Sequence, residues 1–384
     1  MDNKNTFKIE SVPVFWRESS STKTVLGIPN RFELSISLDS KLNLLKQTYS
    51  IETDKFLTEM YKQNENIGYL RDDHPLSKSY GSEFIEFIST STDIINEHIL
   101  DIGCGGMYIL KKLKSLGGIV SGCDPSPFAK EASITNNIEL FQRFFPDLEI
   151  STKFDVILHY DVLEHIWDPK KFLTDCASKL KENGKIIFSM PDCSEQIEEG
   201  DISLFAHQHV NFFTINSIKN LLSICGFCKI NVIRSSKTGK LLCSGIKKES
   251  SLQTSSSLND KAHKEAVIFF KKVHQKYELI QDQIKRDFES IGSNDKIGFY
   301  PPLRAMPYLA DYIDDIDLQK KICFIDDNLL ARGKYMCNVA IPIYPLDDKE
   351  NHNCRIIYIA SKAYKQRMTE KVINCNSKIL IRYI

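Results

Sequence analysis

The stretch Ile99-Leu100-Asp101-Ile102-Gly103-Cys104-Gly105-Gly106 decides the fold predicted for this 384-residue chain. Its apolar start predicts a buried parallel strand, and residues 107–116 after the glycines predict a helix. Glycines let a ligand approach the backbone closely, and the start of a helix offers free N–H groups. A dinucleotide-binding turn requires G-x-G-x-x-G, and here Tyr108 stands at the last glycine position. The stretch therefore predicts a nucleotide-type α/β unit and argues against a dinucleotide as its ligand.

Downstream segments extend this unit. Gly118-Ile-Val-Ser-Gly-Cys-Asp124 is predicted to be a second strand, and its terminal acid lies about 20 residues after the first glycines, where such folds bind ribose hydroxyls. Residues 154–160 and 184–191 predict two further strands. Strand and helix patterns alternate from residue 99 to about residue 246, as a parallel sheet requires.

These segments resemble a known family. An acid at Asp101, directly before the first glycine, resembles motif I of the class I S-adenosylmethionine (SAM) methyltransferases. Residues 154–169 resemble the fourth strand and following helix of the same family, including its Glu164-His165 pair. The resemblance implies SAM as the cofactor, and a Rossmann-like fold for another ligand is the alternative.

The resemblance also implies roles for individual residues. Asp124 would bind the ribose hydroxyls, and Asp101 would orient the glycine loop and the methionine end of SAM. Gly103, Gly105 and Asp161 complete the expected cofactor site. Tyr160 lies with Asp161 beside the expected sulfonium and is a further catalytic candidate. The Glu164-His165 pair would cap or orient the following helix.

Composition narrows the classes of function. Lys and Arg total 50 and so do Asp and Glu, and no basic stripe stands out, which argues against nucleic acid as a partner. No apolar run approaches the roughly 18 residues that span a bilayer, and the N-terminal residues lack the apolar core of a signal peptide. Eleven scattered cysteines suit a reducing compartment. We expect a soluble, cytoplasmic protein.

Cys225-Gly-Phe-Cys228 is a C-x-x-C motif that can indicate zinc binding or redox chemistry. It lies between a predicted helix (218–224) and a predicted strand (229–233), and no second cysteine or histidine pair follows at zinc spacing. We therefore expect two small, half-buried residues beside the helix-ending Gly226 rather than a metal site.

The chain divides into three predicted domains. Residues 1–80 form a small α+β N-terminal domain, and residues 81–248 form the Rossmann-like SAM-binding domain. A Ser/Thr-rich linker at 250–260 leads to residues 261–384, where a helix precedes a second Rossmann-like domain. The fold class is thus α/β, with two Rossmann-like domains after a small first domain.

This order is similar to that of the sugar C-methyltransferases that act on nucleotide-linked deoxysugars. Their N-terminal domain binds zinc, but no cysteine precedes Cys104 here, so that zinc site cannot exist. Residues 298–304 resemble the family's glycine-rich loop, with Arg304 at its lysine position, although Tyr300 replaces a small residue. The resemblance implies that Arg304 holds a substrate phosphate through its guanidinium group, and an ordinary surface arginine is the alternative.

The segment Phe205-Ala-His207-Gln208-His209-Val-Asn-Phe-Phe-Thr214 resembles that family's Glu-His-x-x-x-Phe element, with His209 at its histidine position. It follows the fifth strand, where open α/β sheets place residues that face the substrate. Loss of a proton from a carbon or hydroxyl acceptor requires a general base, and histidine has a suitable pKa. His209 is the candidate base, His207 is a second candidate, and Gln208 stands at the family's glutamate position as a substrate-binding candidate. Surface or helix-capping roles for both histidines are the alternative.

The sequence leaves three functions open. The first is SAM-dependent methyl transfer to a nucleotide-activated sugar or related glycan precursor, at carbon or oxygen. The second is O-methylation of another small hydroxylated or phosphorylated metabolite. The third is a methyltransferase-like binding subunit without activity. The retained Asp101, Gly103, Gly105 and Asp124 argue against the third function, and we favour the first.

Overall fold

The computed structural model describes residues 6–13, 18–20, 31–62, 77–146, 152–203, 205–248, 260–336, 339–362 and 364–384. The chain folds as two compact units. The central unit contains residues 38–194 and 210–266, and the terminal unit contains residues 1–37, 195–209 and 267–384. The predicted linker at 250–260 lies almost wholly outside the described residues.

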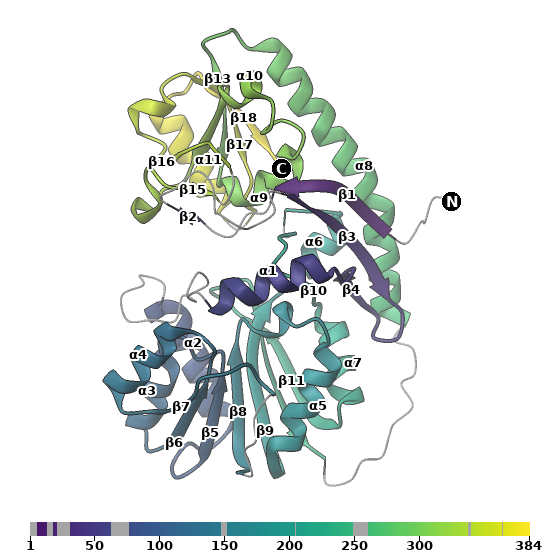
Figure 1. The fold of residues 1–384 in the computed structure, drawn as a ribbon. Coiled ribbons are helices and arrows are strands. Elements are labelled where there is room, and N and C mark those ends of the chain that lie inside the picture. The colour runs from purple at the N-terminus through teal and green to yellow at the C-terminus, as the bar shows by residue number, and fades with distance from the viewer. Residues whose placement is uncertain are drawn as a thin grey trace. The chain divides into compact units, whose positions relative to one another are not determined.

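A seven-stranded mixed sheet forms the middle of the central unit, with the strand order β11-β12-β9-β8-β5-β6-β7 (Figure 1). The five strands from β9 to β7 run parallel, as the alternating pattern predicts. β12 pairs antiparallel with both β9 and β11, so the sheet is not parallel throughout. The strands are β5 (His98–Ile102), β6 (Ile119–Cys123), β7 (Glu139–Phe141), β8 (Phe154–Tyr160), β9 (Leu180–Pro191), β11 (Phe227–Arg234) and β12 (Lys240–Lys247).

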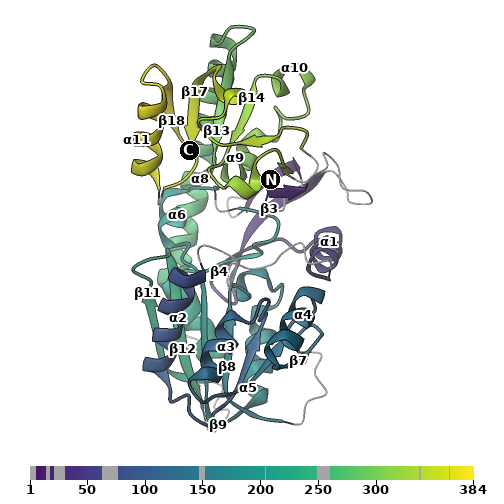
Figure 2. The same ribbon diagram turned by 90° about the vertical axis from the view of Figure 1, so that its left-hand side faces the viewer.

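Helices cover both faces of this sheet and give the unit three layers. α2 (Ser77–Ser91) and α3 (Tyr108–Ser115) pack on one face with α4 (Pro127–Asn136) beside them, and Figure 2 views the unit from this side. α5 (Pro169–Lys179) and α7 (Ile215–Ile224) cover the other face. Three of these helices begin at a capping residue. Ser126 caps α4 and Asp168 caps α5, each followed by a proline in the first turn, and Thr214 forms a capping box with Ser217 at the start of α7.

Smaller elements complete the central unit. β4 (Leu44–Gln47) pairs antiparallel with β10 (Asn211–Phe212), and a short 3₁₀ turn, η1 (Leu163–His165), follows β8. α1 (Ile51–Lys62) follows β4.

The terminal unit contains a second, fully parallel sheet with the strand order β16-β14-β13-β17-β18. The second Rossmann-like sheet expected from the sequence is therefore confirmed. Its strands are β13 (Lys296–Tyr300), β14 (Ile322–Ile325), β16 (Ile343–Tyr344), β17 (Cys354–Ile359) and β18 (Leu380–Tyr383). Its helical elements are α9 (Pro302–Leu309), α10 (Ile316–Gln319), η2 (Leu329–Ala331), η3 (Lys349–Asn351) and α11 (Lys365–Cys375).

Two antiparallel strand pairs join this unit. β1 (Thr6–Pro13) pairs with β3 (Arg31–Asp39), and β2 (Glu18–Ser20) pairs with β15 (Tyr335–Met336). The remaining helices, α6 (Ser194–Glu199) and the long α8 (Asp260–Ser290), each run across a boundary between the two units. None of the helices in the described ranges is both long and apolar enough to cross a lipid bilayer.

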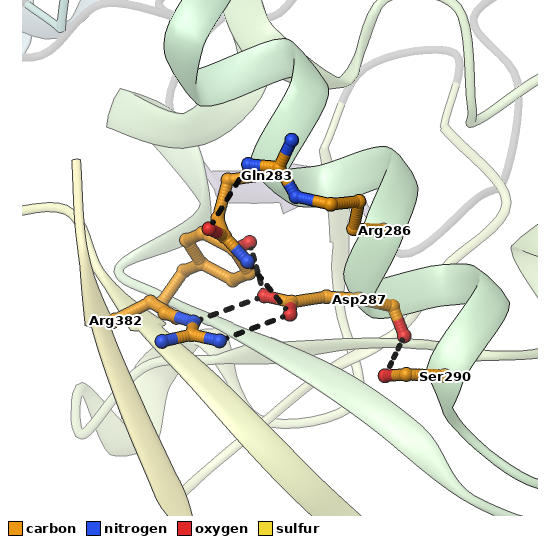
Figure 3. Close-up of polar contacts among 6 residues, drawn as sticks. Gln283, Arg286, Asp287, Ser290 and Arg382 are labelled. Atoms are coloured by element: carbon orange, nitrogen blue, oxygen red, sulfur yellow. Dashed lines mark hydrogen bonds and ion pairs between the residues drawn. The ribbon is translucent and has the colours of Figure 1, made fainter.

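A buried carboxylate ties α8 to the C-terminal sheet (Figure 3). Asp287 is 4% exposed and accepts hydrogen bonds from Arg382 on β18 at 3.2 Å, from the Tyr358 hydroxyl at 2.5 Å and from Gln283 at 2.9 Å. These donors lower the pKa of Asp287 against the opposing effect of burial. The charge is fully satisfied, so the cluster has a structural role.

Candidate active site

The glycine loop after β5 has the geometry of a ligand-binding turn. Gly103 has a φ of +74°, and its N–H donates to the Cys123 carbonyl at 2.7 Å. A Cβ at Gly103 would lie 2.6 Å from Cγ2 of Val162, so a side chain does not fit there. Gly105 has a φ of +44°, and a Cβ there would meet nothing within 4 Å. The loop therefore packs tightly at Gly103 and faces open space at Gly105.

The helix that follows begins without a side-chain cap. Met107 is the N-cap residue of α3, in the left-handed region at φ +58°, and its side chain accepts no backbone hydrogen bond. The first N–H groups of α3 are consequently left for a ligand or water. The Met107 side chain itself is buried.

Asp124 follows β6 directly, as the sequence predicts, and its carboxylate is held in one orientation. Oδ2 accepts from the Gly105 N–H at 3.0 Å, and Oδ1 accepts from the N–H and hydroxyl of Ser126 at 2.9 and 2.6 Å. Oδ2 thus keeps capacity for a further donor, and the Ser126 hydroxyl can rotate away from Oδ1. This is an arrangement that suits vicinal hydroxyl groups.

Asp101 lies on the neighbouring strand and is the more unusual acid. It is 4% exposed, and within the described chain no group donates a hydrogen bond to its carboxyl. Burial first, and then the negative charge of Asp124, raise its pKa to about 7. An acid with no hydrogen-bond donor beside a second acid fits a cationic ligand group, which would supply both the missing donor and the opposite charge. The residues present therefore fit SAM, whose methionine part carries an ammonium group.

Tyr160 and Asp161 mark the end of β8, next to β5 in the sheet. Asp161 has a φ of +56°, and its N–H donates to the Ser189 carbonyl at 3.0 Å. Burial, followed by the nearby Asp161 charge, raises the pKa of the Tyr160 hydroxyl, which therefore stays neutral. Asp161 forms an ion pair with Lys240, the first residue of β12. Lys240 was missed by the sequence analysis.

The Glu164-His165 pair lies in η1, just after this edge. Glu164 is buried, and its carbonyl accepts from the Val210 N–H at 2.8 Å. The next helix, α5, is capped instead by Asp168, whose Oδ1 accepts from the Lys171 N–H at 2.9 Å. Helix capping, one of the two roles expected for Glu164 and His165, is thus performed by Asp168.

The remaining predicted residues belong to the terminal unit. His207 is fully buried, with its ring edge-on to Phe32 at 5.9 Å, and burial lowers its pKa to about 4. It is therefore a core histidine rather than a surface one. Gln208 is also buried, whereas His209 is half-buried and its N–H donates to the Ala206 carbonyl at 3.0 Å. Arg304 is exposed on α9.

The C-x-x-C cysteines both contact backbone. The Cys225 thiol donates to the Lys170 carbonyl at 3.5 Å, and the Cys228 thiol donates to the Ile246 carbonyl at 3.4 Å. Burial raises the pKa of Cys225 to about 12, so the free side chain is a neutral thiol at ordinary pH.

Comparison with known proteins finds relatives for part of the chain. Residues 73–231 match the family model described as a methyltransferase domain. A ubiquinone biosynthesis O-methyltransferase of Coxiella burnetii is 33% identical over 113 residues, which are 27% of this chain and 48% of that protein. Its mitochondrial counterpart in Schizosaccharomyces pombe is 24% identical over 181 residues, 40% of this chain and 66% of that protein. The chain thus spans about half the length of the first of these relatives.

Solved structures give a weaker likeness. The N-methyltransferase NodS of Bradyrhizobium japonicum, solved with S-adenosylhomocysteine, is 15% identical with a TM-score of 0.39, covering 51% of this chain and 99% of that one. The magnesium protoporphyrin IX methyltransferase of Synechocystis, solved with S-adenosylhomocysteine, is 16% identical with a TM-score of 0.36, covering 44% of this chain and 83% of that one. The family match and the strand order together make residues 73–231 a class I SAM-dependent methyltransferase domain.

Proposed function

We propose that this protein transfers the methyl group of SAM to a small-molecule acceptor. The observation that carries the proposal is the pair of acids at one edge of the central sheet: Asp124, held by Gly105 and Ser126, and Asp101, which has no donor in the described chain. SAM supplies an electrophilic methyl group on a sulfonium, so the protein has mainly to align donor and acceptor. Asp101, Gly103, Gly105 and Asp124 hold the cofactor in this proposal, and Tyr160 and Asp161 lie on the side of the methyl group.

The acceptor in this proposal is a nucleotide-linked sugar or a related glycan precursor. The resemblance in domain order supports it, as does the second parallel sheet in the terminal unit. Arg304 is exposed near the start of α9, directly after β13, and a guanidinium group there is available to phosphate oxygens. Gln208 and Arg304 are the proposed acceptor-binding residues. O-methylation of another small hydroxylated molecule is the second candidate, because both curated relatives described above are named O-methyltransferases.

His209 is the proposed general base. Its half-buried ring retains access to solvent, and it directly precedes Val210, whose N–H is bonded to the Glu164 carbonyl after β8. His207 has the same chemistry, but its complete burial and lowered pKa make it the weaker candidate. We expect His209→Ala to abolish turnover while SAM affinity stays within about twofold of wild type. Unchanged turnover would remove His209 from the mechanism.

Calorimetric titration of SAM tests the cofactor site. Asp124→Ala should weaken binding by about 1–3 kcal/mol, since it removes a hydrogen-bonded charged group. Asp175→Ala is a matched control, because Asp175 lies on α5 and forms an ion pair with Lys171 at 2.7 Å. SAM binding that is weakened to this extent in Asp124→Ala and unchanged in Asp175→Ala would support the proposal. Absence of binding to the wild-type protein would overturn it and favour a binding subunit without activity.

Transfer of labelled methyl groups then tests the acceptor class. The probes are a panel of nucleotide-linked sugars, the same sugars without the nucleotide, and simple phenols. Label on the nucleotide-linked sugars, reduced in Arg304→Ala through KM rather than kcat, would support the acceptor proposed here. Label on phenols alone would favour the second candidate.

A further inference from the structure

Lys240 is a buried lysine at the carboxyl-end edge of the central sheet that the cofactor site does not use. It opens β12 and lies opposite Pro191, the last residue of β9, because these two strands are antiparallel. Its side chain is only 10% exposed, which is rare for lysine. Its position and burial together place a positive charge where the parallel strands of the sheet end.

The surroundings of the ammonium group leave part of its bonding capacity unused. Nζ forms an ion pair with Asp161 and lies 4.1 Å from the ring centroid of Tyr160 and 5.4 Å from that of Tyr80. The ring faces attract the charge but accept no conventional hydrogen bond. An ammonium group has three N–H donors, and in the part of the chain that the structure describes Asp161 is its one oxygen acceptor. Two donors thus remain for an oxygen from outside the protein.

The backbone around Lys240 is held in place. In the turn between β11 and β12, the Ser235 N–H donates to the Lys240 carbonyl at 2.8 Å. The Glu83 carboxylate on α2 accepts from the Ser235 hydroxyl at 2.5 Å and from the Ser236 N–H at 3.1 Å. The turn is therefore tied to the neighbouring helix, so the ammonium group is positioned before any ligand arrives.

The order of strands places Lys240 beyond the proposed cofactor. Asp124 follows β6, Asp101 lies on β5, Asp161 follows β8, and Lys240 begins β12 on the far side of β9. At about 4.8 Å per strand, β12 lies roughly 19 Å from β6 across the sheet. A cofactor with its ribose at Asp124 and its charged end near Asp101 leaves the Asp161–Lys240 side for the acceptor.

A structural role alone is a poor account of a lysine here. Burying an ion pair costs desolvation, and an apolar side chain of similar size usually stabilises such a position equally well. We propose that Lys240 is a specificity-determining residue that binds the methyl acceptor through an oxygen carrying negative charge, either a carboxylate or an ionised hydroxyl. This inference rests on the proposed function for the identity of the ligand as the acceptor. Lys240 forms no covalent bond; its charge favours the deprotonated form of the acceptor.

The first test needs neither SAM nor turnover. The probe is 4-nitrophenolate, which offers one oxyanion to the ammonium group and a flat ring to the two tyrosines, and its absorbance reports its ionisation. Wild-type protein should bind it and lower its apparent pKa relative to the free probe. Lys240→Gln, which can still donate a hydrogen bond to Asp161 and so preserve the fold, should weaken binding at least about tenfold.

The controls separate charge from packing. Lys247→Gln alters the other end of β12, where Nζ donates to the Leu180 carbonyl at 2.9 Å, and should bind the probe like the wild type. Lys240→Arg keeps the charge and should retain most of the affinity and the lowered pKa of the probe. Failure of the wild type to bind the probe, or equal binding by Lys240→Gln, would overturn the inference.

SAM titration of the same variants separates this inference from the proposed function. Lys240→Gln should bind SAM within about threefold of wild type, because Lys240 lies beyond the cofactor. Absent SAM binding in the wild type would overturn the proposed function, while the probe experiment would still test the anion site at Lys240. Loss of SAM binding in Lys240→Gln, with unchanged binding of the probe, would make Lys240 part of the cofactor site instead.

Discussion

SAM binding should release a proton from Asp101, and the amount should depend on pH. The carboxyl of Asp101 is buried without a hydrogen-bond donor in the described chain, and its pKa is raised to about 7 by burial and by Asp124. A cationic ligand group beside it favours the ionised form and returns the pKa to its ordinary range or below. In the ligand-free protein Asp101 is therefore about half protonated at pH 7, whereas in the complex it is ionised.

The magnitude follows from the pKa of Asp101. With a pKa of about 7 in the free protein, the fraction protonated is about 0.9 at pH 6, 0.5 at pH 7 and 0.1 at pH 8. The same numbers are the protons expected to leave Asp101 on binding at each pH. Because the proton competes with the ligand, the apparent Kd of SAM should tighten about tenfold, or about 1.4 kcal/mol, between pH 6 and pH 8.

Calorimetry in buffers of different ionisation enthalpy measures these protons directly. The control is Asp101→Asn, which keeps the shape of the side chain and removes its titration. At pH 6 the variant should release about 0.9 proton fewer than the wild type, whatever the ligand's own groups contribute. Equal proton release by the two proteins at pH 6 would refute the assignment of Asp101 as the acid beside the charged end of the cofactor.

The same shift affects the stability of the free protein. Since the folded pKa of Asp101 lies above the ordinary value near 3.8, stability is lost as pH rises between these two values. Asp101→Asn should therefore stabilise the ligand-free protein at pH 8, by up to about 4 kcal/mol, and much less at pH 4. Urea unfolding at the two pH values measures this difference.

Three further predictions concern packing and charge. His159 is fully buried, neither of its ring nitrogens is hydrogen-bonded in the described chain, and burial lowers its pKa to about 3. The stability of the wild-type protein should therefore fall as the pH drops below about 6.5. In urea unfolding, His159→Phe should lose less stability than the wild type between pH 7.5 and pH 5. Arg382→Met should cost about 3 kcal/mol by leaving the buried Asp287 without its cation, and adding Asp287→Asn should restore part of that loss. Gly103→Ala should lower the free energy of unfolding by about 2 kcal/mol in the same assay, because Gly103 has a φ of +74° and a Cβ there would lie 2.6 Å from the Val162 side chain. Gly105→Ala should cost less, because a Cβ at Gly105 would meet nothing within 4 Å.

The central sheet could be predicted because parallel strands buried on both faces have a strong local pattern. Apolar runs that end in a glycine or an acid mark β5, β6 and β8 within a residue or two, and the acids proposed to bind the cofactor lie at or just after those ends. The short strands β4 and β10 were not predicted, because two to four residues carry no periodicity. Their pairing is a tertiary contact between segments more than 160 residues apart.

The environment of the histidines was harder to predict. His207 and His209 are two residues apart in a polar-looking segment, yet one is fully buried against Phe32 and the other is half-buried. The difference depends on a strand from the beginning of the chain, which no local pattern reports. Sequence reasoning proposed histidine as the base, but it could not tell which of the two residues is fully buried and which is half-buried.

Lys240 shows how an acceptor-side residue escapes the usual rule for open α/β sheets. That rule searches the carboxyl ends of the strands, where Asp101, Asp124 and Asp161 were found. β12 runs antiparallel to β9, so its first residue, not its last, reaches the same edge. A lysine after a glycine turn reads locally as a solvated loop residue, and only the direction of β12 places it beside Asp161. In a methyltransferase sheet with an antiparallel strand, the amino end of that strand therefore belongs in any search for residues that bind the acceptor.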